Sequence, residues 1–376
     1  MKVFKWLGGL LLAVIILAIG FVGGFAIDIF IVDKPQTETF VSGDLSIHFL
    51  QLGNKYTGDC VYIKCGENDI LIDAGSRNDS SSTIINYVDE YVTDNTLEYV
   101  IATHGHEDHI AAFYSESDRV GIFDYYKVEN IIDFPLTNSS ATSRTVVGKY
   151  YAARAQEIAD GANHWTALEC YNNENGASRI IQLSNDVELE ILYNYYYDHT
   201  QSSGENDYSV CVMINQGDNH YLFTGDLEER GEERLVEYYA ENHGGLPHCV
   251  LYKAGHHGSK TSSCPLLMET ITPEYVCVCC CAGTSEYTDT AENQFPTQEF
   301  IDNVAPYTDN VYVTSMVDNY VDKSDFSSLG SVKPMNGNIV FTVSGNTITL
   351  VFSDSDLKLK DADWFKNNRT CPSAWL

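Results

Sequence analysis

The chain has 376 residues, of which 44% are apolar, so it is long enough for one large domain or two ordinary ones with a substantial core. Its 53 acidic and 22 basic side chains give a formal net charge of −31. A field of that sign repels polyanions at long range. It excludes general coating of nucleic acid, but not a phosphodiester held by site-bound metal ions.

The chain begins with a long apolar run over residues 6–32, in which Asp28 is the only charged residue. Up to Ile27 this run is long enough to span a bilayer as a helix. Lys2 and Lys5 precede it, so the positive-inside rule keeps the N-terminus in the cytoplasm. We therefore expect a single-pass protein of the cell membrane whose remaining chain is extracytoplasmic. The alternative is a cleaved signal peptide, in which case the protein is secreted.

The composition predicts four segments in chain order. They are a membrane anchor over residues 1–32, a short linker over 33–43, one large domain over 44–355 and a C-terminal tail over 356–376.

Alternating apolar residues predict strands in both halves of the large domain, and apolar residues at helical spacing predict helices between them. Strands are expected at 45–52, 60–64, 69–73, 99–102, 187–192, 209–215, 220–224, 250–254, 310–314, 339–343 and 347–352, and helices at 83–91, 146–160, 228–240 and 296–304. The last two strands read as a closing hairpin. Two strand-rich halves with helices outside predict an α/β fold, a four-layered αββα sandwich whose strand-end loops meet at one edge.

The 11 cysteines all follow the apolar N-terminal run. Four of them lie within residues 275–282, which is more typical of a buried strand than of a disulfide cluster. Cys60 and Cys65 flank a predicted strand and are a candidate disulfide pair, a choice that the sequence leaves open.

The turn after the predicted strand at 99–102 contains three imidazoles and two carboxylates within seven residues. Imidazole and carboxylate groups are the ligands that zinc and similar divalent metals prefer. His104 and His106 can converge on one ion, which leaves Asp108 and His109 to face a second ion, as in two-metal hydrolases. The sequence therefore predicts a metal site at this turn.

Three further strand ends carry polar residues of the same kind. Asp73 ends the strand at 69–73, and Asp226 follows the strand at 220–224, where its two oxygens can each serve a different cation. His256 and His257 follow the strand at 250–254 in a glycine-rich turn. Such a pair suits one metal ligand and one acid–base partner.

Basic and hydroxyl groups surround these two histidines. Lys253, Ser259 and Lys260 are candidates to bind an anionic group such as phosphate, because the basic residues stand out in so acidic a chain.

In this order, the spaced histidines, the Asp73-x-Gly75 strand end, Asp226 after Thr-Gly, and His-His-Gly-Ser at 256–259 resemble the metallo-β-lactamase superfamily. They are most similar to the metallo-hydrolase domain of ComEC-type DNA-uptake proteins. Residues 206–209, the run at 275–284 and Phe295-Pro296 also resemble that subgroup, so the resemblance covers about residues 44–315. The many-helix membrane channel of ComEC proteins is missing from this chain, since one span cannot form a pore.

The resemblance implies a binuclear zinc site, with manganese as the alternative metal. It assigns His104 and His106 to one ion, Asp108 and His109 to the second, and Asp226 to a bridging position. His257 takes the last ligand role and His256 lies beside the substrate, although the two can be exchanged. The family often adds one more histidine, for which His164 and His199 are the candidates.

The implied activity is metal-assisted hydrolysis outside the membrane, in which Asp108 orients the attacking water and His256 donates a proton to the leaving oxygen. A phosphodiester is the leading substrate class, either DNA or a polymer of the cell envelope, so we expect a phosphodiesterase or nuclease. A β-lactam or other amide or ester hydrolase is one alternative. The other is a non-catalytic, membrane-tethered binding module of an uptake or envelope complex.

Overall fold

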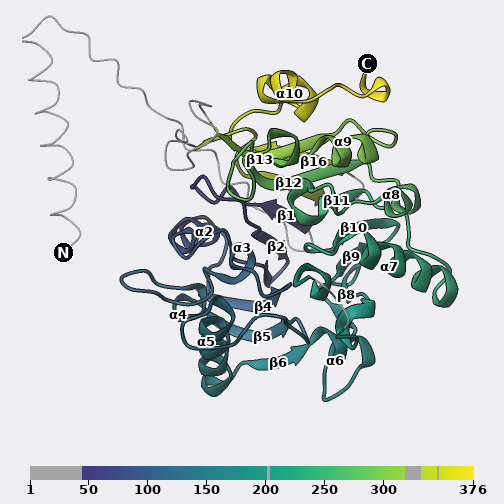
Figure 1. Cartoon of the computed structure of the whole chain (residues 1–376). Coiled ribbons are helices and arrows are strands. Elements are labelled where there is room, and N and C mark those ends of the chain that lie inside the picture. The colour runs from purple at the N-terminus through teal and green to yellow at the C-terminus, as the bar shows by residue number, and fades with distance from the viewer. Residues whose placement is uncertain (1–44, 201–203, 318–331, 345–346) are drawn as a thin grey trace, which may run out of the picture. The chain divides into compact units, whose positions relative to one another are not determined.

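The computed structural model describes residues 45–200, 204–317, 332–344 and 347–376, all within the compact unit Thr39–Leu376 (Figure 1). The predicted membrane anchor at 1–32 and linker at 33–43 lie outside the described residues. Within the described part of the chain, no helix has the length and apolar character that crossing a membrane requires.

The first sheet has eight strands in the order β16-β15-β1-β2-β3-β4-β5-β6. Its strands β3 to β6 are parallel, so their carboxyl ends meet at one edge. The bounds are β1 Leu45–Phe49, β2 Val61–Cys65, β3 Asn68–Ile72, β4 Thr96–Ala102, β5 Lys127–Asp133, β6 Asn163–Thr166, β15 Ile339–Ser344 and β16 Thr347–Phe352.

The second sheet also has eight strands, in the order β14-β13-β12-β11-β10-β9-β8-β7. Strands β10 to β13 run parallel. The bounds are β7 Ile180–Gln182, β8 Val187–Ile191, β9 Val212–Gln216, β10 Asn219–Phe223, β11 Leu251–Lys253, β12 Tyr275–Ala282, β13 Val311–Val317 and β14 Val332–Pro334.

The two sheets pack face to face, with helices on their outer sides (Figure 1). Strand β12 shows this alternation, because Cys277 and Cys279 join the core between the sheets while Val278 and Cys280 pack with the outer helices. The helices are α2 Ser80–Val88, α3 Glu107–Ile110, α4 Ile122–Tyr125, α5 Val146–Asp160, α6 Ala167–Asn172, α7 Glu229–Asn242, α8 Pro265–Ile271, α9 Gln298–Val304 and α10 Asp363–Asn368. The predicted αββα sandwich is confirmed.

Several details differ from the predictions. Strands β5 and β6 were not predicted, and the first helix begins at Ser80 rather than at residue 83. The closing hairpin exists, but it extends the first sheet by pairing β15 with β1. Helix α10 lies in the C-terminal segment, where Trp364, Phe365 and Trp375 are buried against the helix layer of the second sheet.

The candidate disulfide between Cys60 and Cys65 is wrong, because both thiols are free. The two residues lie at opposite ends of one extended strand, which places their Cα atoms roughly 16 Å apart. A disulfide requires Cα atoms within about 7 Å.

Strand ends place every predicted site residue at one edge of the sandwich. Asp73 follows β3, the histidine turn follows β4, Asp226 follows β10, and His256 and His257 follow β11. In open sheets with parallel strands, ligands bind where the carboxyl ends of the strands meet. The topology therefore brings together residues that are more than 180 positions apart in the chain.

Candidate metal centre

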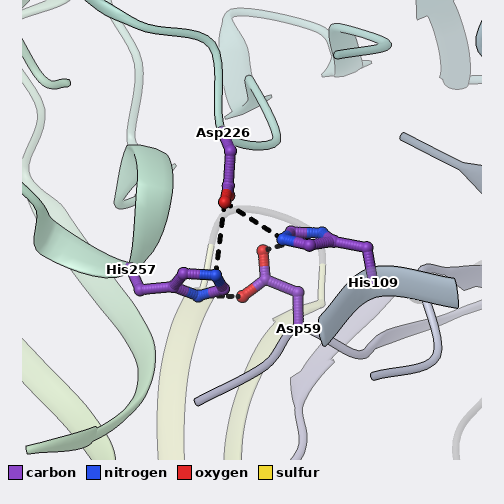
Figure 2. A group of neighbouring side chains, drawn as sticks. All are labelled: Asp59, His109, Asp226 and His257. Atoms are coloured by element: carbon purple, nitrogen blue, oxygen red, sulfur yellow. Dashed lines mark ion pairs between the residues drawn. The ribbon is translucent and has the colours of Figure 1, made fainter. Parts of the chain in front are cut away.

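The strand-end turns meet around the carboxylate of Asp226 (Figure 2). Its Oδ2 lies 3.1 Å from Nε2 of His109 and 3.3 Å from Nε2 of His257. The same oxygen is 4.0 Å from Nε2 of His104 and 3.9 Å from Nε2 of His256. One carboxylate oxygen thus faces four imidazoles from two distant segments.

The histidine turn is held by Asp73, which is itself buried. The Asp73 carboxylate accepts hydrogen bonds from the backbone N–H and the hydroxyl of Thr103, both at 2.7 Å. Its Oδ2 also lies 2.7 Å from Nδ1 of His109. At Gly75, a Cβ would lie 1.6 Å from the carbonyl oxygen of Asp108, so only glycine lets the two turns approach this closely.

Asp226 is positioned by its own backbone turn. Gly225 has a φ of 55°, in the left-handed region that favours glycine. The backbone N–H of Asp226 donates to Oγ of Ser209 at 3.0 Å. The neighbouring Val210 N–H donates to the carbonyl of Thr103, which joins the two sheets at the site.

His256 and His257 both adopt left-handed backbone conformations, with φ values of 45° and 55°. Such conformations cost energy in residues with side chains and cluster at functional sites. Here they direct both rings toward Asp226. His257 is fully buried, whereas the His256 side chain is 20% exposed.

Asp59, which precedes β2, is the member of the cluster that the sequence analysis missed. Its Oδ1 lies 3.0 Å from Nδ1 of His257, and Nδ1 of His257 also lies 2.9 Å from the carbonyl of Cys279. Oδ2 of Asp59 forms a buried ion pair with Lys253. A Gly-Asp pair before a strand is an ordinary turn pattern, so the sequence carried no specific signal for Asp59.

His109 and His257 are therefore oriented in the same way. Each has a carboxylate at Nδ1, Asp73 for His109 and Asp59 for His257, and each directs Nε2 toward Asp226. A carboxylate behind a metal-binding imidazole fixes the ring and its tautomer. This arrangement leaves Nε2 of both histidines facing the centre, while Nδ1 of His257 is hydrogen-bonded to the carbonyl of Cys279 and lies 3.0 Å from Oδ1 of Asp59.

The buried polar atoms at the centre fit a metal ion. Nε2 of His109, Nε2 of His257 and Oδ1 of Asp226 are buried without a hydrogen bond of good geometry. Such atoms are rare in folded proteins because each costs free energy when buried unpaired. The grouping of Asp59, His109, Asp226 and His257, with potential ligand atoms within 4.8 Å of one another, is of the kind that holds a cation.

The remaining predicted ligands surround this group. Nε2 of His104 lies 3.0 Å from Nδ1 of His106, and Oδ2 of Asp108 lies 3.4 Å from Nε2 of His257. All six predicted ligands thus lie at one site, and their ligand roles stay predictions. Oδ2 of Asp226 faces the imidazoles while its Oδ1 lies 3.9 Å from Nζ of Lys253, and the bridging role of this carboxylate stays a prediction.

The two candidates for an additional histidine have other contacts. Nε2 of His164 lies 2.9 Å from Asp133, which also pairs with Arg154. His199 stacks on Tyr195 with ring centroids 3.9 Å apart. Neither histidine is in the group that could hold a metal among the described residues.

A cleft of about 380 Å³ opens onto the centre and is lined by Arg77, His106, Glu107, Asp108, Asp226, His256 and Tyr287. Lys253 does not line it, because its side chain is 3% exposed and is paired with Asp59. The cationic group that faces the cleft is Arg77 instead. Lys253 therefore supplies internal charge balance rather than an exposed anion site.

Metal binding is expected to release protons. Burial alone lowers the pKa of an imidazole, but at His109 and His257 the neighbouring carboxylates outweigh it, so the pKa of each is raised well above its ordinary value. Both imidazoles are then protonated near neutral pH in the metal-free protein, and a metal must displace those protons.

Titration calorimetry with zinc in buffers of different ionisation enthalpy measures this release. We expect up to about two protons per site, one from each imidazole, and weaker metal affinity as the pH falls. Metal binding without proton release would show that these imidazoles are neutral or are not ligands.

Comparison with known proteins supports the predicted resemblance. Residues 53–122 match the model of the metallo-beta-lactamase superfamily. This stretch contains Asp59, Asp73 and the histidine turn, whereas Asp226 and His257 lie beyond it and are placed at the site by the fold. The chain is also 38% identical over 71 residues to competence protein ComA of Neisseria gonorrhoeae. That stretch is 19% of this chain and 10% of ComA, so the match spans about a tenth of the relative's length.

Two solved structures have a similar backbone. The metallo-beta-lactamase fold protein YhfI from Bacillus subtilis is 10% identical, with 72% of this chain and 95% of YhfI covered and a TM-score of 0.38. The diiron beta-hydroxylase CmlA from Streptomyces venezuelae is 15% identical, with 73% of this chain and 45% of CmlA covered and a TM-score of 0.35. The sequence matches confirm the resemblance to the metallo-β-lactamase superfamily, and metal-dependent hydrolysis is the class of activity that they support.

Proposed function

We propose that the protein is a metal-dependent phosphodiesterase or nuclease of ComEC-like type. One observation carries the proposal: two buried imidazoles and a buried carboxylate converge at one point beneath a cleft, with atoms that lack a hydrogen bond of good geometry. Ion pairs among these groups offset part of the cost of burial, and a metal ion in place of the imidazole protons would satisfy the same atoms.

The donor set of imidazole nitrogens and carboxylate oxygens suits zinc, with manganese as the alternative. His109, His257 and Asp226 would hold metal together with His104, His106 and Asp108, in a site for two ions. Metal bound there would lower the pKa of water toward neutrality and stabilise the negative charge that develops during hydrolysis.

His256 is placed to move a proton at the mouth of the site. Its Nδ1 lies 3.0 Å from the hydroxyl of Thr261, which in turn donates to Glu228 at 3.2 Å. In the tautomer consistent with this chain of hydrogen bonds, Nδ1 donates to Thr261 and Nε2 faces Asp226 and the cleft. Nε2 then carries the lone pair of the neutral ring, so it accepts a proton first and can afterwards donate that proton to the leaving oxygen of a substrate.

Asp108 completes the polar floor of the cleft. Its Oδ2 lies 3.4 Å from Nε2 of His257 and accepts the hydroxyl of Tyr287, so the carboxylate is placed to orient a water molecule in the cleft. Asp108 would then act as the carboxylate that orients water, and His256 as the group that transfers the proton.

The substrate class follows from charge. The net charge of −31 disfavours long polyanions at a distance, while a cationic metal centre would favour an anionic group at the cleft itself. DNA and a phosphodiester of the cell envelope are the two candidate substrates. The apolar run at 6–32 supports a membrane-anchored protein whose site lies outside the cytoplasm.

A substrate panel tests the proposal on the full-length chain in detergent, loaded with zinc or manganese. The panel contains single-stranded DNA, bis(4-nitrophenyl) phosphate, a phosphocholine ester and a chromogenic cephalosporin. We expect phosphodiester cleavage that falls by at least about 100-fold in Asp108→Ala and His106→Ala.

Other outcomes assign the competing functions. Cleavage of the cephalosporin alone would indicate an amide hydrolase. Absence of stoichiometric metal and of all four activities would indicate a non-catalytic binding module. Full activity in Asp108→Ala would exclude the role proposed for that carboxylate.

A further inference from the structure

A segment between β12 and α9, which we call the strap and define as residues 283–297, borders the cleft. Its ends are fastened together, since the Gly283 N–H donates to the carbonyl of Phe295 at 2.9 Å. At its far end, the Thr297 N–H donates to the carbonyl of Gly258, beside the histidine pair. Arg369 donates to two strap carbonyls, those of Gln294 and Pro296. The strap is therefore attached to the same turn that carries His256 and His257.

Glu286 anchors the strap on its other side. Its carboxylate accepts the backbone N–H of Thr57 at 2.7 Å and pairs with Arg77 at 2.5 Å. The Glu286 side chain is 4% exposed, so this contact is buried. The anchor fixes the position of the next residue, Tyr287.

Tyr287 projects from this anchor into the cleft. Its hydroxyl donates to Oδ2 of Asp108 at 2.5 Å, yet the residue as a whole is 52% exposed. The ring centroid of Phe295 lies 5.8 Å from that of Tyr287. The Phe295 centroid also lies 5.6 Å from the ring centroid of His256 and 5.9 Å from that of His257. The result is a half-exposed tyrosine whose ring lies beside Phe295 and whose hydroxyl is bonded to Asp108 at the candidate metal centre.

This combination is poorly explained by packing alone. A tyrosine that stabilises the core buries its ring and keeps its hydroxyl near water, which is the usual amphipathic arrangement. Tyr287 does the opposite, with the hydroxyl toward the buried carboxylate and much of the residue exposed. An exposed ring beside a polar centre is typical of a surface that stacks on a planar ligand.

We propose that Tyr287 is a specificity-determining residue that contacts the substrate twice. When substrate binds, its hydroxyl redirects its one proton from Asp108 to an oxygen of the phosphoryl group, and its ring stacks on a planar group attached to the phosphate. The inference rests on the proposed function, because it assumes that a phosphoryl group occupies the cleft. Arg77 and Glu286 act through Tyr287 as positioning residues.

The test compares phosphate esters that carry a planar ring with phosphate esters that carry none. Thymidine 5′-monophosphate and glycerol 1-phosphate are titrated into the zinc-loaded full-length protein, and turnover is measured with bis(4-nitrophenyl) phosphate and glycerophosphoglycerol. Tyr287→Phe removes the hydroxyl, and Tyr287→Ala removes hydroxyl and ring. Tyr125→Phe is the matched control, because its hydroxyl donates to Asp89 at 2.6 Å on an exposed surface that does not line the cleft.

We expect Tyr287→Ala to weaken binding of the thymidine nucleotide about 10-fold more than that of glycerol 1-phosphate, through loss of stacking. Tyr287→Phe should weaken both ligands by a similar factor of about 5, through loss of one hydrogen bond. The same preference should appear in KM for the two diesters. Metal content and thermal midpoint should stay unchanged in all variants, and Tyr125→Phe should behave as wild type.

Two results would overturn the proposal. One is that Tyr287→Ala binds each phosphomonoester as tightly as wild type does. The proposal fails in the same way if wild type binds neither ligand. The other is loss of metal in Tyr287→Phe, which would show that the hydroxyl acts only through Asp108. If wild type cleaves neither diester but the ring preference holds in binding, the proposed activity fails while the role of Tyr287 stands.

Discussion

Asp226→Asn should lose nearly all hydrolytic activity and most of its metal affinity. The carboxylate contacts four imidazoles through a single oxygen, so no other side chain can replace its charge at the centre. Removing one partner from a buried charged cluster costs about 3–5 kcal/mol. We therefore expect kcat/KM and the zinc association constant each to fall about 1000-fold.

The same variant should also change the proton release on metal binding. The carboxylate of Asp226 contributes to the raised pKa of both His109 and His257. With the charge removed, burial dominates and the pKa of each imidazole falls toward or below its ordinary value. Fewer protons are then displaced by zinc, which calorimetry in two buffers detects directly.

Asp198→Asn is the matched control for this substitution. Asp198 also contacts a histidine, His199, but both side chains are about half exposed and lie in a loop. That variant should keep its activity, metal affinity and proton release. A fully active Asp226→Asn enzyme would contradict the central place given to this carboxylate.

Most secondary structure followed from local pattern. Helix α5 has the bounds that its helical spacing predicted, and in the structure Thr145 caps its first turn and Gly161, with a φ of 115°, ends it. The αββα sandwich and the positions of the strand-end turns also followed from the alternation of apolar residues. These features depend on residues that are close together in the sequence, so the sequence pattern alone was enough to predict them.

Long-range partners could not be predicted in the same way. The pairing of Phe49 with Ile339 places the closing hairpin beside β1, a contact between residues 290 positions apart. Asp59 contacts His257 and Lys253 across almost 200 residues, and without knowledge of those contacts it resembles a turn residue. For the same reason Lys253 was interpreted as an anion-binding cation, when its partner is a buried carboxylate.

Tyr287 illustrates a second limit. Nothing in the sequence at 283–297 indicates chemistry, since the segment contains turn residues and acidic groups of an ordinary kind. Its importance comes from the anchor of Glu286 on Thr57 and Arg77, which the folded chain creates. Motifs predicted the residues that meet at the centre, including Asp73, but not Asp59, Arg77 or Tyr287.

Lys253→Met should be the most destabilising single substitution near the site. Lys253 and Asp59 are each 3% exposed and form a direct ion pair. With the ammonium removed, the Asp59 carboxylate is buried without its main counter-charge, which costs about 3–5 kcal/mol. Urea unfolding of the metal-free protein measures the loss as a lower midpoint at unchanged slope.

A double-mutant cycle separates the charge from the shape of Lys253. Adding Asp59→Asn to Lys253→Met removes the uncompensated carboxylate, so the double variant should regain a large part of the lost stability. Its metal affinity should stay low, because His257 no longer has a carboxylate at Nδ1. Removing a group that orients a metal ligand typically lowers metal affinity 10- to 100-fold.

Lys127→Met is the control for loss of a lysine ion pair. Lys127 pairs with Glu129 at 2.9 Å, with side chains 67% and 44% exposed, and such surface pairs contribute between about 0 and 1 kcal/mol. If Lys253→Met is no more destabilising than Lys127→Met, the Asp59–Lys253 pair does not balance charge at the centre. If instead the double variant binds zinc as tightly as wild type, Asp59 does not orient His257, and the equivalence drawn between Asp59 and Asp73 is wrong.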